Sequence, residues 1–171
     1  MTDTQQITLT LNGEAKTLKV SARTHLADAL ADAGSSLPVL GCEHGVCGAC
    51  TLMMDGVSLR SCLILAVQAD RADIQTVQGL QDSPVLQLLN AAFLKHQALQ
   101  CGYCTSAMLI TAHEWLNSQP GDISRQAARE VISGNLCRCT GYEAIINALV
   151  EVATRLRADP MDSQPKPAGP A

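Results

Sequence analysis

Residues 41–50, GCEHGVCGAC, place three cysteines and three glycines within ten positions. Glycine has no side chain and adopts positive φ values freely, so a loop built on Gly41, Gly45 and Gly48 can wrap tightly and aim backbone N–H groups inward. Inward-pointing backbone dipoles stabilise negative charge at a fixed point. The segment therefore predicts a loop that surrounds an anionic group held by thiolates.

The spacing of the cysteines narrows the chemistry of this loop. Cys42, Cys47 and Cys50 follow the pattern C-x4-C-x2-C, and Cys62 supplies a fourth thiol further along the chain. This is the ligand spacing of a plant-type [2Fe-2S] ferredoxin site. The alternatives are structural zinc and a disulfide framework, but structural zinc sites usually space their ligands as two short C-x2-4-C pairs. We therefore expect an iron-sulfur cluster here.

A second set of four cysteines lies in the C-terminal half, as Cys101-x2-Cys104 and Cys137-x-Cys139. Each pair adjoins the start of a predicted helix, where free N–H groups and the positive end of the helix dipole favour an anion. Spacing alone leaves three interpretations open, because C-x-C is unusual both for clusters and for tetrahedral zinc. They are a second iron-sulfur cluster, a zinc site of the same four thiols, and a redox-active dithiol at Cys101 and Cys104.

Composition limits the class of protein. The 171 residues suffice for two small domains, and the net charge of -4 without a basic stripe argues against nucleic acid as a partner. Charged residues make up 16% of the chain, against a typical quarter, which fits either a large partner interface or simply an alanine-rich sequence. No apolar run approaches the roughly 20 residues that span a bilayer, so membrane insertion is not expected. The start MTDTQQITLT lacks a signal-peptide pattern, so a cytoplasmic location is expected, with periplasmic co-export beside a signal-bearing partner as the alternative.

The N-terminal half alternates apolar and polar residues in short segments separated by Asn-Gly and Asp-Gly turns. The expected strands are residues 7–11, 16–20, 51–54, 57–66 and 74–77. Thr24 is expected to cap a short helix that ends at Gly34. The strand over residues 57–66 would carry Cys62 back toward the ligand loop. These elements predict a β-grasp, plant-type ferredoxin-like domain over residues 1–78.

After residue 78 the apolar residues recur at helical spacing. The expected helices are residues 84–93, 101–117, 124–132 and 141–156. Ser83 and Ser124 are expected to cap the first and third of them. Short connections predict a four-helix bundle over residues 79–158, so the fold class of the whole chain is α+β. Residues 159–171 hold four prolines and no periodicity, which predicts a disordered Pro-rich tail.

Four segments carry a resemblance to a known family: GCEHGVCGACTLMMDG, RSCLILA, QCGYCTSAML and NLCRCTGY. In this order they resemble the iron-sulfur small subunit of the molybdenum hydroxylases, the family of xanthine dehydrogenase, aldehyde oxidoreductase and carbon monoxide dehydrogenase. The resemblance covers residues 7–156 and implies two [2Fe-2S] clusters. The implied ligands are Cys42, Cys47, Cys50 and Cys62 for the ferredoxin-like cluster, and Cys101, Cys104, Cys137 and Cys139 for the helical-domain cluster.

The resemblance also implies a non-catalytic electron-transfer subunit. In this family substrate is oxidised at a molybdenum-pterin centre in a partner large subunit, and electrons leave through the helical-domain cluster and then the ferredoxin-like cluster. An FAD-binding medium subunit or a cytochrome receives them. Gln100 occupies the position that contacts the pterin cofactor in the family. Where the family commonly has Pro-Gly, this chain has Ser106-Ala107, which suits the first turn of a helix, so ligation is expected to survive.

Two other functions compete with this one. A free two-cluster ferredoxin-type shuttle should be well charged for transient docking, whereas this chain is sparsely charged and has a whole helical domain beyond one cluster. A zinc-stabilised interaction module is the third possibility.

Arg138, between two ligands, is expected either to raise the reduction potential of the second cluster or to bind a carboxylate of the partner subunit. The resemblance implies that the pocket of the large subunit sets the substrate.

Overall fold

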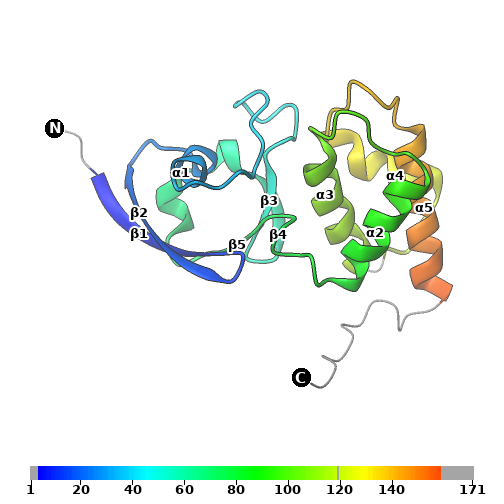
Figure 1. The fold of residues 1–171 in the computed structure, drawn as a ribbon, viewed down its shortest axis with the longest axis horizontal. Helices are drawn as coiled ribbons and strands as arrows, with labels where there is room; N and C mark the ends of the chain where they lie inside the picture. The colour runs from blue at the N-terminus through cyan, green and yellow to red at the C-terminus, as the bar shows by residue number, and fades with distance from the viewer. Residues whose placement is uncertain (1–3, 119, 159–171) are drawn as a thin grey trace, which may run out of the picture.

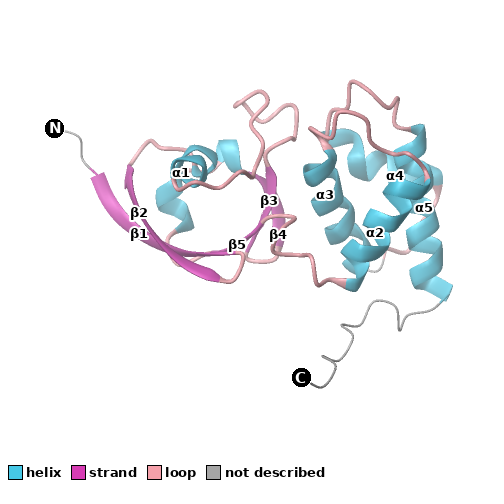
Figure 2. Cartoon of the chain, in the orientation of Figure 1, coloured by secondary structure: helices cyan, strands magenta, loops and turns pink. Residues whose placement is uncertain are grey.

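The computed structural model describes residues 4–118 and 120–158. A mixed sheet with one helix forms the N-terminal part, and four further helices form the C-terminal part (Figures 1 and 2). The architecture is therefore α+β, with a sheet-containing part followed by a helical region. The tail predicted over residues 159–171 lies outside the described residues. No helix in the described ranges is long and apolar enough to cross a membrane.

The sheet has five strands in the order β2-β1-β5-β3-β4. Their bounds are β1 Thr4–Leu11, β2 Glu14–Ser21, β3 Thr51–Met54, β4 Val57–Arg60 and β5 Asp73–Gln75. The pairs β1–β2 and β3–β4 are antiparallel hairpins, as predicted, and β1 pairs with β5 in parallel. Ile7, Leu9 and Leu11 alternate along β1 with more exposed neighbours and are buried against Leu26 and Leu30 of α1 (Leu26–Asp32). The apolar residues of the alternating sequence pattern thus form the buried face of the sheet.

Two local predictions in this part are wrong. Thr24 does not cap α1, because His25 occupies the N-cap position without a side-chain hydrogen bond and the Thr24 hydroxyl pairs with that of Ser21 at 2.9 Å. Strand β4 ends at Arg60, and short 3-10 helices follow at η1 (Ser61–Leu63) and η2 (Ala66–Ala69). The Ala66 N–H donates to the Thr24 carbonyl at 2.8 Å. This bond ties the segment to the start of α1 and takes it out of the β3 ladder.

The helical region contains four α-helices within the described residues. Their bounds are α2 Pro84–Lys95, α3 Thr105–Asn117, α4 Arg125–Val131 and α5 Glu143–Ala158. Ser83 and Ser124 cap α2 and α4 as predicted, accepting from the backbone N–H groups of Leu86 and Ala127. Helix α3 starts later than predicted, since Gly102 has a φ of +81° and the chain turns there before the helix begins.

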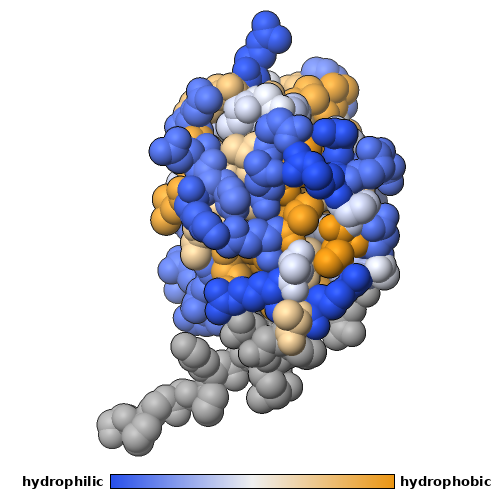
Figure 3. Space-filling model, turned by 90° about the vertical axis from the view of Figure 1, so that its right-hand side faces the viewer, coloured by the Kyte–Doolittle hydropathy of each residue, from blue (hydrophilic) through white to orange (hydrophobic). Residues whose placement is uncertain are grey.

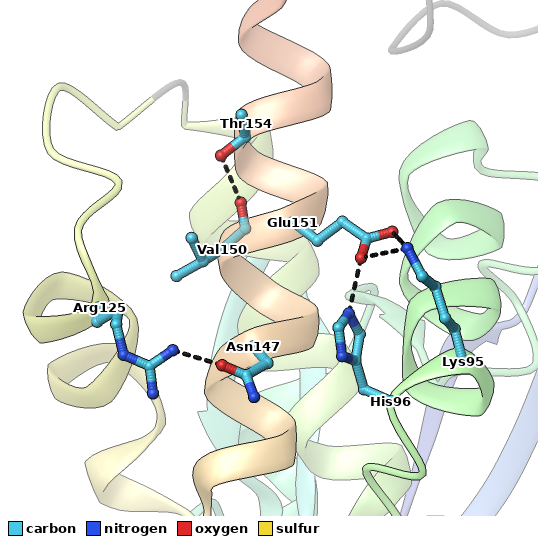
Figure 4. A network of polar contacts seen from close by, with 7 residues as sticks. All are labelled: Lys95, His96, Arg125, Asn147, Val150, Glu151 and Thr154. Atoms are coloured by element: carbon cyan, nitrogen blue, oxygen red, sulfur yellow. Dashed lines mark hydrogen bonds and ion pairs between the residues drawn. The ribbon is translucent and has the colours of Figure 1, made fainter.

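Apolar side chains from all four helices share one core. Its largest fully buried members include Phe93, Leu86, Met108, Ile110, Ile132 and Ile145. At the surface, Glu151 of α5 bridges to Lys95 and His96 at the end of α2, with His96 Nε2 at 2.7 Å (Figure 4). Exposed ion pairs such as these contribute little stability each, so the buried apolar core holds the helices together. The face of the molecule seen in Figure 3 is largely hydrophilic, with hydrophobic residues scattered over it.

The sheet and the helices pack directly against each other. Met53 of β3 belongs to the core of the helical region, and β3 and β4 both contact α3. The Ser58 N–H of β4 donates to Glu114 Oε1 of α3 at 3.0 Å. In Figure 1 the loop over residues 41–50 and the loops that lead into α3 and α5 lie at the same, upper side of the molecule.

Candidate iron-sulfur centres

The first four cysteines are brought together by the loop before β3 and by η1 after β4. Cys50 and Cys62 are buried, and Ala27 and Leu40 pack against them. The Ser61 hydroxyl donates to the Cys50 carbonyl at 2.8 Å, and the Ser61 N–H contacts the same oxygen at 3.3 Å. Cys62 therefore reaches the loop from a 3-10 turn, and the predicted strand position for it is wrong although its proximity is right.

Backbone N–H groups point at sulfur in this loop, as its glycines predicted. The Cys47 N–H donates to Cys42 Sγ at 3.3 Å. This bond, together with one from the His44 backbone, lowers the pKa of the Cys42 thiol to about 6. Burial raises the pKa of Cys62 to about 11, with the neighbouring Cys50 thiol adding to the shift. The loop thus stabilises the thiolate form of Cys42 at its open side. At its covered side, Cys62 would lose its proton only when a bound iron ion offsets the negative charge of the thiolate.

Two of the glycines are required by close packing. Gly45 has a φ of +84°, and a Cβ there would collide with the Leu63 side chain. Gly48 has a φ of +73°, and a Cβ there would lie 2.9 Å from Asn135 Nδ2 and well inside contact with the Gly134 carbonyl. The second contact crosses to the helical region, so the first loop is shaped partly by its neighbour.

The second set lies where the segments before α3 and α5 meet. Cys101 and Cys139 are exposed, with their Sγ atoms 3.6 Å apart. Cys104 and Cys137 are half-buried, and burial, followed by the Cys137 thiol, raises the pKa of Cys104 to about 12. At Cys137 burial acts to raise the pKa of the thiol. Hydrogen bonds from Thr140, including one from Oγ1 at 3.1 Å, outweigh burial, so the pKa of Cys137 is lowered. Cys104 is also the N-cap residue of α3, so one helix start does adjoin the site.

The eight thiols are arranged in pairs. Within each pair the two thiols interact directly, and the pairs are Cys42 with Cys47, Cys50 with Cys62, Cys101 with Cys139, and Cys104 with Cys137. A [2Fe-2S] cluster bound by four cysteines takes two thiolates on each iron. The donor set therefore fits two [2Fe-2S] clusters.

The two sets of thiols are adjacent in space. The Leu136 N–H, next to Cys137, donates to the Cys47 carbonyl at 2.8 Å. Tyr103, between Cys101 and Cys104 in the sequence, hydrogen-bonds to the Leu40 carbonyl next to the first loop. These contacts join segments that are far apart in the chain, so the two sites form one continuous unit.

The remaining sequence-predicted residue, Gln100, is exposed, and its Nε2 donates to the Cys139 carbonyl at 3.1 Å. Two residues that sequence reasoning missed also lie at the sites. Asn135 is buried between the two loops, and Arg60 donates to the Thr51 hydroxyl and the Gly134 carbonyl. Asn135 lies in the NLCRCTGY segment, and this was the one signal that could have drawn attention to it.

Fold and sites together define a protein with two [2Fe-2S] centres, one in a ferredoxin-like domain and one in a helical region. Comparison with known families agrees. Residues 9–80 match the model of a 2Fe-2S iron-sulfur cluster binding domain, and residues 76–150 match that of a [2Fe-2S] binding domain.

Individual relatives identify the family. The nicotine 6-hydroxylase small subunit of Paenarthrobacter nicotinovorans is 47% identical over 87% of this chain and 90% of its own length. The caffeine dehydrogenase subunit gamma of Pseudomonas sp. (strain CBB1) is 49% identical over 86% of this chain and 90% of its own. A crystal structure of quinoline 2-oxidoreductase from Pseudomonas putida 86 matches with a TM-score of 0.81 and 47% identity, covering 91% of this chain and 98% of the other. The chain belongs to the iron-sulfur small subunits of the molybdenum hydroxylases. As such it is an electron-transfer subunit with two [2Fe-2S] clusters, and the partner subunit carries the molybdenum-pterin cofactor.

Proposed function

We propose that the four thiols of the helical region and the four of the ferredoxin-like loop are the ligands of the two clusters, and that electrons enter at the former and leave at the latter. Each bound cluster supplies a one-electron acceptor and donor. The observation that carries the proposal is the 2.8 Å bond from Leu136 N–H to the Cys47 carbonyl, because it joins the backbones of the two ligand segments directly.

Exposure supports the assignment of the entry side. Cys101 and Cys139 are the two exposed cysteines, whereas Cys50 and Cys62 are buried. An electron from another subunit has the shortest approach at an exposed ligand pair. Gln100 is held beside that pair by its bond to the Cys139 carbonyl, so its amide is in place to meet the pterin cofactor of the large subunit.

The surface around the two sites supports an assembled subunit. Several large apolar side chains are exposed there: Val46 (59%), Leu63 (57%), Leu136 (52%) and Tyr103 (49%). Exposed apolar groups gathered at one site mark a surface that a partner covers. We propose that the side formed by Tyr103 and Leu136 packs against the large subunit, and that Val46 and Leu63 face the acceptor, an FAD-binding medium subunit or a cytochrome.

We also propose that the chain divides into a ferredoxin-like domain over residues 1–78, a helical domain over residues 79–158 and a Pro-rich tail over residues 159–171. Contacts of α2 with α3 and α5, and of α4 with α5, support an antiparallel four-helix bundle in the second domain. The shared core of all four helices supports the same arrangement.

The names of three relatives indicate the substrate class of the assembled enzyme. Nicotine, caffeine and quinoline each contain a nitrogen heteroaromatic ring, and the relatives named for them are 47–49% identical to this chain. We propose that the enzyme containing this subunit oxidises a nitrogen heteroaromatic compound. This proposal rests on the subunits evolving together, since the substrate pocket lies in the large subunit.

Two cysteine variants test the order of the centres in the natively purified complex. In Cys139→Ser, quinoline or nicotine should no longer reduce the ferredoxin-like centre within one turnover, while dithionite still does. In the matched variant Cys47→Ser, the same substrate should still reduce the helical centre. If substrate reduces the ferredoxin-like centre of Cys139→Ser at the wild-type rate, the proposed order is wrong.

A further inference from the structure

Asn135 is a fully buried polar residue between the two candidate centres, with 0% of its surface exposed. Its side chain forms hydrogen bonds in two directions. Nδ2 donates to the Gly48 carbonyl at 3.0 Å and approaches Thr51 Oγ1 at 3.4 Å, and Oδ1 accepts from Thr111 Oγ1 at 3.1 Å. Gly48 and Thr51 flank Cys50 of the ferredoxin-like loop, whereas Thr111 belongs to α3. The side chain thus connects the two parts of the molecule.

The backbone of Asn135 is tied to the second ligand set. Its carbonyl accepts from the Tyr142 hydroxyl at 3.0 Å, and that same hydroxyl accepts from the Cys137 N–H at 2.8 Å. The next residue, Leu136, donates its N–H to the Cys47 carbonyl. A displacement of Asn135 would therefore move a ligand segment of each centre.

Arg60 approaches the same point from the ferredoxin-like domain. Its guanidinium donates to Thr51 Oγ1 at 2.5 Å and to the Gly134 carbonyl at 2.7 Å. The Thr51 hydroxyl itself donates to the Gly48 carbonyl at 2.6 Å. One donor and two acceptor positions are all that a hydroxyl offers, so Arg60 and Asn135 complete its hydrogen bonding.

We infer that Asn135 is a positioning residue that holds the Cys47–Cys50 segment of one centre against the Cys137 segment of the other, and so sets the interaction between the two centres. The inference rests on the ligand sets proposed above. The amide supplies at once the donors that reach Gly48 and Thr51 and the acceptor that Thr111 reaches. Arg60 acts in the same contact from the opposite side.

Two variants weaken this contact and one serves as a matched control. Asn135→Ala removes the amide, and Arg60→Met removes the guanidinium while keeping an unbranched side chain. Thr111→Val removes a hydrogen bond to Asn135 that lies wholly within the helical region. Asn135→Ala should fold, because the Gly48 carbonyl keeps both Thr51 donors and the Thr111 hydroxyl can direct its single proton to the Ala107 carbonyl, 3.0 Å away.

The readouts are the magnetic splitting between the two reduced centres in low-temperature EPR spectra and the rate of iron loss to a chelator. Asn135→Ala should change the splitting and speed iron loss from the ferredoxin-like centre about tenfold, as expected for losing a buried hydrogen bond. Arg60→Met should change both in the same direction. Thr111→Val should keep the wild-type splitting and iron-loss rate.

The outcomes separate this inference from the function it rests on. If the wild-type complex shows two [2Fe-2S] signals and both Asn135→Ala and Arg60→Met keep its splitting and iron-loss rate, the inference is overturned. Should Asn135→Ala fail to fold, Arg60→Met alone decides by the same criterion. A wild-type complex without two signals would overturn the ligand assignment and the inference together.

Discussion

Substituting alanine for Gly48 tests how the ferredoxin-like loop is shaped by the helical region. Gly48 has a φ of +73°, and its missing side chain leaves room for the Gly134 carbonyl, Asn135 Nδ2 and Arg60. Gly56, in the turn between β3 and β4, is the matched control. Its φ is +84°, and a Cβ there would meet no atom within 4 Å. The two substitutions share the backbone strain and differ in the clash.

The expected magnitudes follow from this difference. Placing alanine in the left-handed conformation costs about 1 kcal/mol, which for a chain of this size lowers the unfolding midpoint by about 2–4 °C. Overpacking against a backbone carbonyl that cannot move aside adds about 2 kcal/mol. Gly56→Ala should therefore lower Tm by about 2–4 °C, and Gly48→Ala by about 6–12 °C.

The assay is thermal unfolding of the purified complex, followed by the visible absorption of the bound clusters and by far-UV circular dichroism. Loss of the ferredoxin-like cluster should precede loss of secondary structure in Gly48→Ala only. If Gly48→Ala and Gly56→Ala lower Tm by the same amount, the close packing of the loop against Gly134 does not constrain it, and the reasoning is refuted.

Three further predictions concern the helical region. Burial lowers the pKa of His113, and among the described residues its Nδ1 has no hydrogen-bond partner, so the folded state favours the neutral ring. The unfolded chain gains a proton below about pH 6.5 while the folded chain does not, so Tm should fall as the pH drops from about 7 to about 5.5, and less so in His113→Gln. Arg138→Gln should lower the reduction potential of the helical centre by on the order of 30 mV, the interaction energy of two unit charges about 6 Å apart in water. An unchanged potential in an EPR-monitored titration would contradict this. Ser106→Pro should leave Tm within about 2 °C of wild type, because the second position of α3 has no intrahelical acceptor for its N–H, and a larger fall in a melting experiment would show that this N–H is needed.

Local signals predicted the elements whose causes are local. The Asn12-Gly13 and Asp55-Gly56 turns produce the two hairpins, because residues with positive φ are required at both. Ser83 caps α2 through its own hydroxyl, which sequence reasoning can anticipate. These features depend on residues that are neighbours in the chain.

Features that depend on distant residues could not be predicted. Thr24 does not cap α1 because its hydroxyl pairs with that of Ser21, and the residues after β4 bond to distant backbone, with the Ser61 N–H on the Cys50 carbonyl and the Ala66 N–H on the Thr24 carbonyl. The contact of Asn135 with the Gly48 carbonyl spans 87 residues, and no spacing rule foretells it. Cysteine spacing could predict which thiols lie together, because it reports on the site itself, but it could not reveal the side chains that hold the two cysteine loops together.

The central claim is that this chain carries two [2Fe-2S] clusters as part of a molybdenum enzyme. Its most direct test is low-temperature EPR of the dithionite-reduced protein, purified natively with whatever co-elutes, together with iron and molybdenum analysis. We expect two distinct [2Fe-2S] signals in a complex that contains molybdenum. Two signals from a lone, molybdenum-free chain, or a protein without iron, would contradict the account.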